Sequence, residues 1–211
     1  MHVKRNIQIL HSIVSRKGSS KVLTFSMPHV FKALQLLYAE KYVSRATFAK
    51  EVHLGDGAVK TLVLHLKETG IADSTRAGTF LTKKGLKFAS EFQKVLPKEL
   101  MLKRSEILRN KFNHAILIKN YAYSIKSGME QRDYAIMYGA SGCTTILFKS
   151  NKFVFPGSEK DCFVNNAKTR DILLKEFTPA EKDVVIISSS EDPFVAEISA
   201  KNSALWTLAT G

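Results

Sequence analysis

The chain opens with helical periodicity. Between Lys4 and Arg16, apolar residues recur every three or four positions, at Ile7, Leu10, Ile13 and Val14, which is the spacing of one face of an amphipathic helix. A second run starts at Pro28, a residue suited to the first turn of a helix. Its apolar side comprises Val30, Phe31, Leu34, Leu37 and Tyr38. The pattern therefore predicts two helices, and the first needs another surface to cover its apolar face.

Two short helices joined by a tight turn are predicted next. Ser44 is placed to cap a helix that buries Phe48, Ala49 and Val52. Residues 53–55 then lead into a second helix, whose narrow apolar face is formed by Val59, Val63 and Leu66 and which Gly70 ends. Helices joined by so short a turn predict a helix-turn-helix. The opposite side of the second helix is polar and is expected to be exposed.

After Gly70 the helical period gives way to alternation. Residues 71–81 predict two short strands around a turn at Arg76-Ala77-Gly78. Thr82 is placed to cap a last helix over residues 83–95. The predicted apolar face of that helix consists of Leu86, Phe88, Ala89, Phe92 and Val95. The predicted order is three helices, a hairpin and a helix.

In FAKEVHLGDGAVKTLVLHLKETGI and FLTKKG, this region resembles the winged helix-turn-helix regulators, including the bacterial and archaeal MarR-like and ArsR-like groups. The resemblance covers about 70 residues, from Met27 to Leu96. It implies that the third helix enters the major groove of DNA and that the hairpin, or wing, contacts the DNA backbone or the minor groove. The DNA-binding residues it implies are Arg45, Asp56, Gly57, Lys60, Thr61, Leu64, His65, Arg76, Lys83 and Lys84.

Among these residues, Lys60 and Thr61 are expected to reach base edges or phosphates, because they lie in the front half of the third helix. The other basic residues are expected to contact phosphates. Gly55 departs from the family pattern, which often has a capping Ser or Thr there. The departure leaves the N–H groups of the helix N-terminus open to a phosphate oxygen.

Pro97 ends the last helix of this region. The following residues 98–111, KELMLKRSEILRNK, place Leu100, Leu102, Ile107 and Leu108 in a pattern that predicts a helical connector. Charge balance and periodicity both change near Asn110. We therefore predict an α+β protein of two domains, with a winged helix over residues 1–110 and a small mixed α/β domain over residues 111–211.

The second half predicts strands and helices in alternation. Residues 114–118 form a buried-strand run, polar helix-compatible residues follow to about Arg132, and residues 139–142 form a turn. Residues 143–148 and 152–155 predict a hairpin about Ser150-Asn151. A helix over 166–177, a strand over 184–187 and a last helix after Asp192-Pro193 complete this half. It resembles uncharacterised archaeal proteins in which a winged helix precedes a domain of unknown function, in QRDYAIMYGASGCTTILF and FPG.

Two loops of the second half carry candidate ligand chemistry. Residues 139–145, GASGCTT, could wrap backbone N–H groups around an anion, and residues 188–192 follow a strand and precede a helix, where α/β domains bind ligands. The alternative, which we favour, is that Asp192 only caps the following helix and that the serines only satisfy backbone groups. The candidate ligand-binding residues are Arg132, Asp133, Gly139, Ser141, Gly142, Thr144, Ser188, Ser189 and Ser190.

Charge separates the two halves. The net formal charge of the chain is +13. Residues 1–110 hold 20 Lys and Arg against 8 Asp and Glu, and residues 111–211 hold 12 against 11. A strongly basic half beside a nearly neutral one predicts a polyanion-binding module joined to a module with another role. The alternative is a generally basic protein whose Lys side chains are only solvated, which gives the same net charge.

No catalytic or metal-binding set emerges from the sequence. Cys143 has no histidine partner other than His114, and His53 and His65 have no third metal ligand at a suitable spacing. Two distant cysteines and the absence of a signal peptide or membrane span favour a reducing, cytoplasmic setting. We therefore expect no enzyme activity, no metal, no cofactor and no membrane partner.

The resulting hypothesis is a cytoplasmic transcriptional regulator that binds double-stranded DNA. The second half would bind a small-molecule effector, form a homodimer, or both. The apolar faces of residues 4–16 and 98–111 motivate the homodimer. The alternatives are an enzyme whose second half acts on a small molecule, and an RNA-binding or protein-bridging factor.

Overall fold

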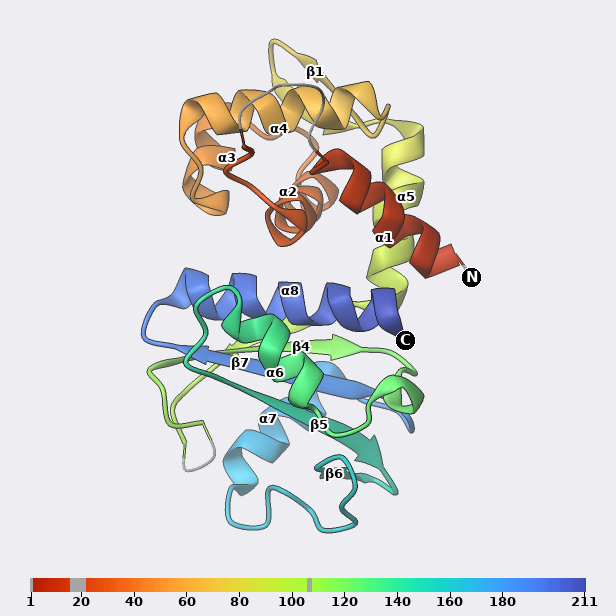
Figure 1. Ribbon diagram of the computed structural model, residues 1–211, viewed down its shortest axis with the longest axis vertical. Coiled ribbons are helices and arrows are strands. Elements are labelled where there is room, and N and C mark those ends of the chain that lie inside the picture. Colours follow the sequence, from red (N-terminus) through yellow and green to blue (C-terminus); the bar gives the residue numbers. More distant parts are fainter. Residues whose placement is uncertain (1, 16–21, 106–107) are drawn as a thin grey trace. The chain divides into compact units, whose positions relative to one another are not determined.

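The computed structural model describes residues 2–15, 22–105 and 108–211 (Figure 1). It is a mixed α+β protein with two sheets. Its contacts divide the chain into two compact units, an N-terminal unit of residues 1–92 and a C-terminal unit of residues 93–211. The division lies in the last turn of a helix, ahead of the domain boundary predicted near Asn110. Each unit is described by itself.

The N-terminal unit contains the predicted helices and hairpin. Its elements are α1 (His2–Ile13), α2 (Met27–Ala39), α3 (Arg45–Val52), α4 (Asp56–Glu68), β1 (Ala72–Thr75), β2 (Gly78–Leu81) and α5 (Lys83–Val95). The predicted end of the first helix, Arg16, lies outside the described residues. Two predicted caps are confirmed: Ser44 Oγ accepts the Thr47 N–H at 3.0 Å, and Thr82 Oγ1 accepts the Gly85 N–H at 3.1 Å.

The core of the N-terminal unit forms from the buried sides of α2 to α5. Phe31 of α2 lies with its ring centroid 5.4 Å from that of Phe92 on α5. The predicted apolar face of α5 was wrong at Leu86, which is 48% exposed, while Gly85 is buried. Gly85 lies so close to the Ile71 carbonyl that a Cβ there would be 1.9 Å from its oxygen. This close approach turns the side of α5 that bears Leu86 outward.

Helix α1 buries its apolar face within the chain. Ile7, Leu10 and Ile13 are buried, and α1 packs against α2. An amphipathic helix that lies on its own core leaves no apolar stripe that requires a second copy. The face that motivated a homodimer through this segment is therefore covered.

The C-terminal unit is built on one antiparallel sheet. Its strands are β3 (Glu99–Leu102), β4 (Phe112–Ile118), β5 (Gly142–Lys149), β6 (Lys152–Val154) and β7 (Val184–Ser190), in the order β3-β4-β7-β5-β6. Every neighbouring pair is antiparallel. Its helices are η1 (Ala122–Ser124), α6 (Met129–Ile136), α7 (Ala167–Phe177) and α8 (Pro193–Thr210).

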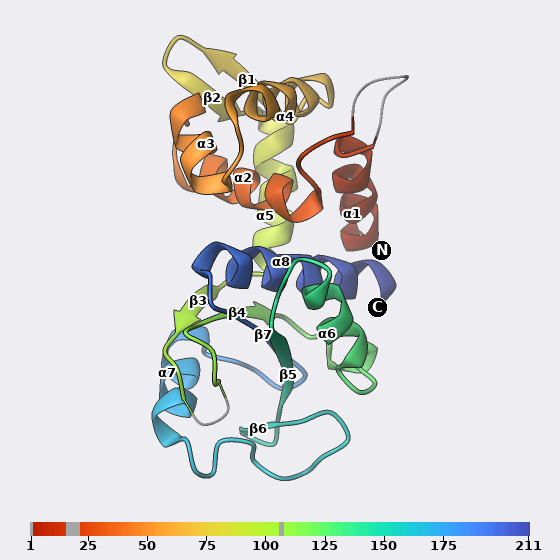
Figure 2. The same ribbon diagram turned by 60° about the vertical axis from the view of Figure 1, so that its left-hand side comes forward.

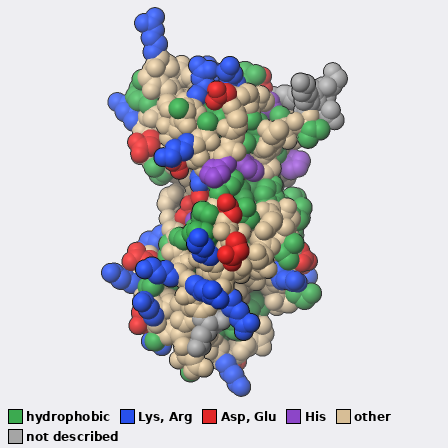
Figure 3. Space-filling view, turned by 90° about the vertical axis from the view of Figure 1, so that its left-hand side faces the viewer, with side chains coloured by type: hydrophobic (Ala, Val, Ile, Leu, Met, Phe, Trp, Pro, Cys, Tyr) green, Lys and Arg blue, Asp and Glu red, His purple; other side chains and the backbone are tan. Residues whose placement is uncertain are grey.

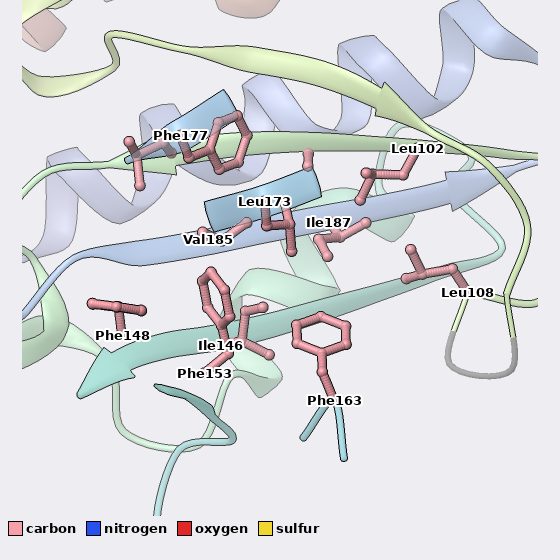
Figure 4. Packing of buried hydrophobic residues seen from close by; sticks show 12 residues of the cluster. Leu102, Leu108, Ile146, Phe148, Phe153, Phe163, Leu173, Phe177, Val185 and Ile187 are labelled. Atoms are coloured by element: carbon pink, nitrogen blue, oxygen red, sulfur yellow. The ribbon is translucent and has the colours of Figure 1, made fainter. Parts of the chain in front are cut away.

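Helices cover both faces of this sheet. Figure 2 shows α7 on one face and α6 and α8 on the other. Leu173 and Phe177 of α7 pack over Val185 and Ile187 of β7 in the hydrophobic cluster of Figure 4. Side chains alternate along a strand, so the residues of β7 that neighbour Val185 and Ile187 in sequence face α6 and α8 instead.

The segment after Pro97 is a strand, so the predicted helical connector over residues 98–111 was wrong. Leu100 and Leu102 of β3 lie two positions apart and face the α7 cluster, while Glu99 faces α8. One residue of the predicted helical pattern, Ile107, lies outside the described residues. The predicted hairpin about Ser150-Asn151 is confirmed. Both turn residues have positive φ, 50° and 61°, as the type I′ turn of a two-residue hairpin requires.

Among the residues that the structure describes, no helix is long and apolar enough to cross a membrane.

Candidate nucleic-acid interface

Helix α4 has an exposed stripe opposite its buried side. Val59, Leu62 and Leu66 are buried. Lys60, Leu64 and Lys67, three or four residues apart, are exposed, so they lie along one face of the helix. Leu64 is 52% exposed in the middle of this stripe. The N-terminus of α4 has no side-chain cap, because Gly55 occupies the N-cap position.

The hairpin β1–β2 is fixed beside α3 by backbone pairing. Val43, just before α3, exchanges two hydrogen bonds with Thr79: each N–H donates to the other carbonyl, at 2.8 and 2.9 Å. Gly78 makes this approach possible. Its φ is 134°, and a Cβ at this position would lie 2.8 Å from the Val43 carbonyl oxygen. The pairing holds the hairpin turn, with Arg76, against the start of α3.

The hairpin, α4 and the start of α3 enclose a groove of about 390 Å³, here called the basic groove. Its lining includes Arg45, Lys60, Lys67 and Arg76 and no acidic side chain. The remaining lining residues are Val43, Ser44, Val63, Leu64, Ser74, Thr75, Ala77, Gly78 and Thr79. Four cations around one groove create a local positive potential that attracts a polyanion.

One acidic residue lies beside this lining. Asp73 forms an ion pair with Lys67, with the Nζ and Oδ1 atoms 3.1 Å apart. A hydrogen bond from the Ser74 N–H, together with the Lys67 ammonium, holds the pKa of Asp73 below its usual value. Asp73 is thus ionised at neutral pH and offsets part of the charge of Lys67. The other three cations of the lining, Arg45, Lys60 and Arg76, therefore contribute most of the positive charge of the groove.

The N-terminal unit as a whole is basic. Residues 1–92 hold 15 Lys and Arg against 6 Asp and Glu. Figure 3 shows one face of this unit, on which Lys and Arg side chains are more frequent than Asp and Glu. The charge of the basic groove is therefore not cancelled by an acidic remainder of the unit.

The structure gathers four of the predicted DNA-binding residues around the basic groove: Arg45, Lys60, Leu64 and Arg76. Lys67 was missed by the sequence analysis, although its spacing of three from Leu64 could have identified it. Gly57, Thr61 and His65 line a different hollow, of about 280 Å³, beside residues 22–25. Thr61 Oγ1 donates to the Gly57 carbonyl at 3.0 Å, a bond internal to α4.

His65, which the family resemblance implied as a DNA contact, has a buried side chain, so that expectation was wrong. Its side chain is 8% exposed, and its Nδ1 lies 2.6 Å from the Ile13 carbonyl oxygen. Because that oxygen only accepts, Nδ1 carries the proton and donates. The ring also packs edge-on to Phe25 at 6.0 Å between centroids. His65 therefore joins α4 to the end of α1.

The remaining predicted DNA contacts are exposed but lie off the basic groove. Asp56 occupies the first turn of α4, where a carboxylate favours the helix dipole. Lys83 starts α5. Lys84 donates from Nζ to the Thr69 carbonyl at 2.6 Å, at the end of α4. The structure thus gives Lys84 a helix-capping role.

The predicted ligand loops of the C-terminal unit lie largely in the antiparallel sheet. Ser188, Ser189 and Ser190 are buried residues of β7, so the predicted loop at 188–190 was wrong. Gly142 and Thr144 belong to β5 and pair with β7. The backbone groups of these residues are used by the ladder, and the sheet has no parallel-strand edge of the type that binds ligands in α/β domains.

The other candidates of this unit also have local roles or lie apart. Ser141 donates its N–H to the Ser189 carbonyl at 2.8 Å, and Ser189 Oγ donates to Asn113 Oδ1 at 2.6 Å. Gly139, with φ 86°, follows α6. Arg132 and Asp133 are exposed on α6. None of the nine residues lines the basic groove or the hollow beside residues 22–25.

A buried ionic cluster lies between the sheet and α8. The Lys201 ammonium is fully buried and bonds both carboxylate oxygens of Glu99. It also lies 3.3 Å from Glu197 Oε1. His114 Nε2 is 3.4 Å from Glu99 Oε2. Burial opposes ionisation of Glu99, but Lys201 and His114 outweigh it and hold the pKa of Glu99 well below its usual range.

Cys143 and His114 do not form a catalytic pair. They lie in one row across the sheet, on β5 and β4, with Ser188 of β7 between them. Two strand spacings separate their backbones by about 10 Å. Burial also raises the pKa of the Cys143 thiol to about 12. A thiol with such a pKa stays protonated at neutral pH and is a weak nucleophile.

Within residues 2–15, 22–105 and 108–211, no three His, Cys, Asp or Glu side chains are grouped so that they could hold a metal ion. Both cysteines are unpaired thiols.

Comparisons with known proteins find similarity without a stated function. Residues 108–208 match a family described as a domain of unknown function, DUF4443. The fold is similar to that of the hypothetical protein PH0730 from Pyrococcus horikoshii OT3, with a TM-score of 0.69 and 25% sequence identity. That similarity covers 85% of this chain and 91% of the other, so it includes elements of both units. No curated protein matches the chain.

Proposed function

We propose that the N-terminal unit is a winged helix-turn-helix that binds duplex DNA, and that the protein regulates transcription in the cytoplasm. In this proposal α4 is the recognition helix and the hairpin β1–β2 is the wing. The observation that carries it is the basic groove, in which Arg45, Lys60, Lys67 and Arg76 surround one concave surface. Lys and Arg side chains gathered on one face are the electrostatic footprint of nucleic-acid binding.

The exposed stripe of α4 supports duplex DNA over other polyanions. A helix fits the major groove of B-form DNA, where base edges can be read. Lys60 reaches toward bases or phosphates from this stripe, and the exposed Leu64 offers an apolar contact to a thymine methyl group. Arg76, at the tip of the hairpin, and Arg45 would contact phosphates on either side.

The C-terminal unit would then serve the regulator as an effector-binding or dimerisation module. Its buried ionic cluster links Glu99 of β3 to Lys201 of α8 and ties this module together. The homodimer remains a prediction, although the apolar face of α1 that motivated it is buried within the chain. Light scattering of the chain with and without duplex DNA would give the number of chains per site.

The proposal is tested by fluorescence anisotropy of the full chain with labelled 30-base-pair duplexes. DNA and RNA duplexes of the same sequence separate it from the RNA-binding alternative. The major groove of A-form RNA is too narrow for a helix, so we expect the DNA duplex to bind at least about 10-fold more tightly. Equal or tighter binding of RNA would favour the alternative, and binding to neither duplex would contradict both.

Substitutions in the basic groove are expected to separate base contacts from phosphate contacts. Lys60→Ala should weaken binding to a selected sequence by about 1 to 3 kcal/mol, provided that Lys60 contacts a base. Arg76→Ala should weaken binding to selected and random duplexes alike, because a phosphate contact carries no sequence information. Titrations of both variants against a selected duplex and a random duplex measure the difference.

Lys50→Ala is the matched control for these variants. Lys50 lies in the same unit on α3, with a side chain that is 84% exposed and lies outside the basic groove. Its loss changes the net charge by the same single unit. If Lys50→Ala weakened binding as much as Lys60→Ala and Arg76→Ala, net charge rather than the groove would explain the affinity.

A further inference from the structure

A third hollow of the N-terminal unit lies between α1 and α5 and has a volume of about 420 Å³. It is here called the α1–α5 hollow. Arg5, Asn6 and Ile9 of α1 line one side, and Ile71 follows the end of α4. The remaining lining residues, from α5, are Lys84, Lys87, Phe88 and Glu91. A volume in this range is typical of small-molecule sites.

The lining of the α1–α5 hollow combines an apolar part with a positive part. Phe88 and Ile71 are buried and Ile9 is half-buried, whereas the three cations Arg5, Lys84 and Lys87 are exposed. Glu91 contributes one negative charge, so positive charges predominate. Sites of this kind bind a ligand through an apolar body and fix its orientation with a few polar groups. The matching ligand has an apolar ring or chain and one carboxylate.

The hollow touches the C-terminal end of the proposed recognition helix. Lys84 lines the hollow and donates to the Thr69 carbonyl at 2.6 Å. Thr69 is the C-cap of α4, and the Ile71 N–H donates to the Leu66 carbonyl at 3.0 Å. A carboxylate that binds the Lys84 ammonium therefore acts on a group that holds the end of α4.

The hollow is also joined to α4 through α1. Ile13, the last residue of α1, accepts the hydrogen bond from His65 of α4. Because Arg5, Asn6 and Ile9 lie on the same helix, a shift of α1 on ligand binding is transmitted to His65. Both connections end on the helix that carries Lys60, Leu64 and Lys67 of the basic groove.

We propose that the α1–α5 hollow binds a small amphipathic carboxylate and that its occupancy changes the affinity of the basic groove for DNA. The proposed binding of the carboxylate depends only on the α1–α5 hollow. Its proposed regulatory effect also depends on the proposed DNA-binding function.

Binding is tested with 2-naphthoate, whose fluorescence reports its environment, and with the neutral 2-naphthalenemethanol. We expect saturable 1:1 binding of 2-naphthoate to the full chain, at least 10-fold tighter than binding of the alcohol. Arg5→Ala and Lys87→Ala should each weaken it about 5-fold or more, and Lys87→Arg should retain it. Lys83→Ala, which removes a cation outside the hollow, should have no effect. Equal binding of the alcohol, or no effect of Arg5→Ala and Lys87→Ala, would overturn the proposed site.

Regulation is tested by the Kd for duplex DNA with and without saturating 2-naphthoate. A coupling of the usual size changes this Kd at least about 5-fold. His65→Phe keeps an aromatic ring beside Phe25 but lacks the donor to Ile13, so it should bind 2-naphthoate normally and lose most of the coupling. His65→Gln, which keeps a donor, should retain part of it. DNA binding with an unchanged Kd overturns the regulation alone, whereas failure to bind DNA overturns the proposed function and, with it, the regulation.

Discussion

Replacing Gly85 with alanine is expected to destabilise the N-terminal unit by about 3 kcal/mol or more, since overpacking against a fixed backbone is costly. A Cβ at Gly85 would lie 1.9 Å from the Ile71 carbonyl oxygen and 3.1 Å from a methyl carbon of Leu81. The α5 helix and the start of the hairpin would have to separate. The sign of the change in stability is informative, because alanine in place of glycine usually stabilises a helix by about 1 kcal/mol. Urea denaturation followed by far-UV circular dichroism measures the change.

Gly57→Ala is the control for this substitution. Gly57 is also helical, in the first turn of α4, but a Cβ there would meet no atom within 4 Å. We expect a neutral or slightly stabilising effect, up to about 1 kcal/mol. Equal stabilities of the Gly85→Ala and Gly57→Ala proteins would show that α5 does not depend on the close approach at Gly85.

Removing the buried ammonium of Lys201 is expected to destabilise the C-terminal unit by about 3 to 5 kcal/mol. Lys201→Ala leaves the carboxylates of Glu99 and Glu197 without their shared partner. Urea unfolding can be followed by the fluorescence of Trp206 on α8, which stacks on Tyr134 with ring centroids 5.7 Å apart. Lys149→Ala, which breaks an exposed pair with Glu159, is the control and should cost less than about 1 kcal/mol.

The cost of Lys201→Ala should depend on pH. The depressed pKa of Glu99 stabilises the folded protein above the ordinary value of 4.5, and this contribution is lost as the pH falls through that value toward the folded pKa. In the Lys201→Ala protein, the Glu99 carboxyl group stays buried without the ammonium, so its protonated form is favoured. The difference in stability between wild type and variant should therefore shrink from pH 7 to pH 3.5. A constant difference would contradict the ionic role of Glu99.

Local patterns were sufficient for most elements of the fold. The caps at Ser44 and Thr82 and the hairpin turn at Ser150-Asn151 are specified by residues within a few positions of one another, so the sequence alone could reveal them. Strand β3 could not be predicted in this way. It pairs with residues 113–116 of β4, and Glu99 meets Lys201, a residue 102 positions away, so the partners of this strand lie outside the local pattern.

The candidate site was predictable in its charges and less so in its arrangement. Arg45, Lys60 and Arg76 are basic residues of α3, α4 and the β1–β2 turn, and the family resemblance implied all three as DNA contacts. The sequence could not reveal that His65 is buried, because its partners, the Ile13 carbonyl and the Phe25 ring, come from segments outside α3 and α4. Ser188 to Ser190 look like a polar loop in sequence, but their pairing with β4 and β5 extends β7 through them.

The central claim, that the basic groove binds duplex DNA, is tested most directly by the salt dependence of binding for two proteins. One is the wild-type chain and the other carries Arg45→Ala, Lys60→Ala, Lys67→Ala and Arg76→Ala together. Because Asp73 offsets part of the charge of Lys67, three to four phosphate contacts predict a slope of log Kobs against log salt of about −2.7 to −3.6, or a loss of about 40- to 150-fold between 50 and 200 mM. We expect this slope for the wild type, and weaker binding with a clearly shallower slope for the quadruple variant. A flat wild-type slope, or the same steep slope in both proteins, would contradict the account.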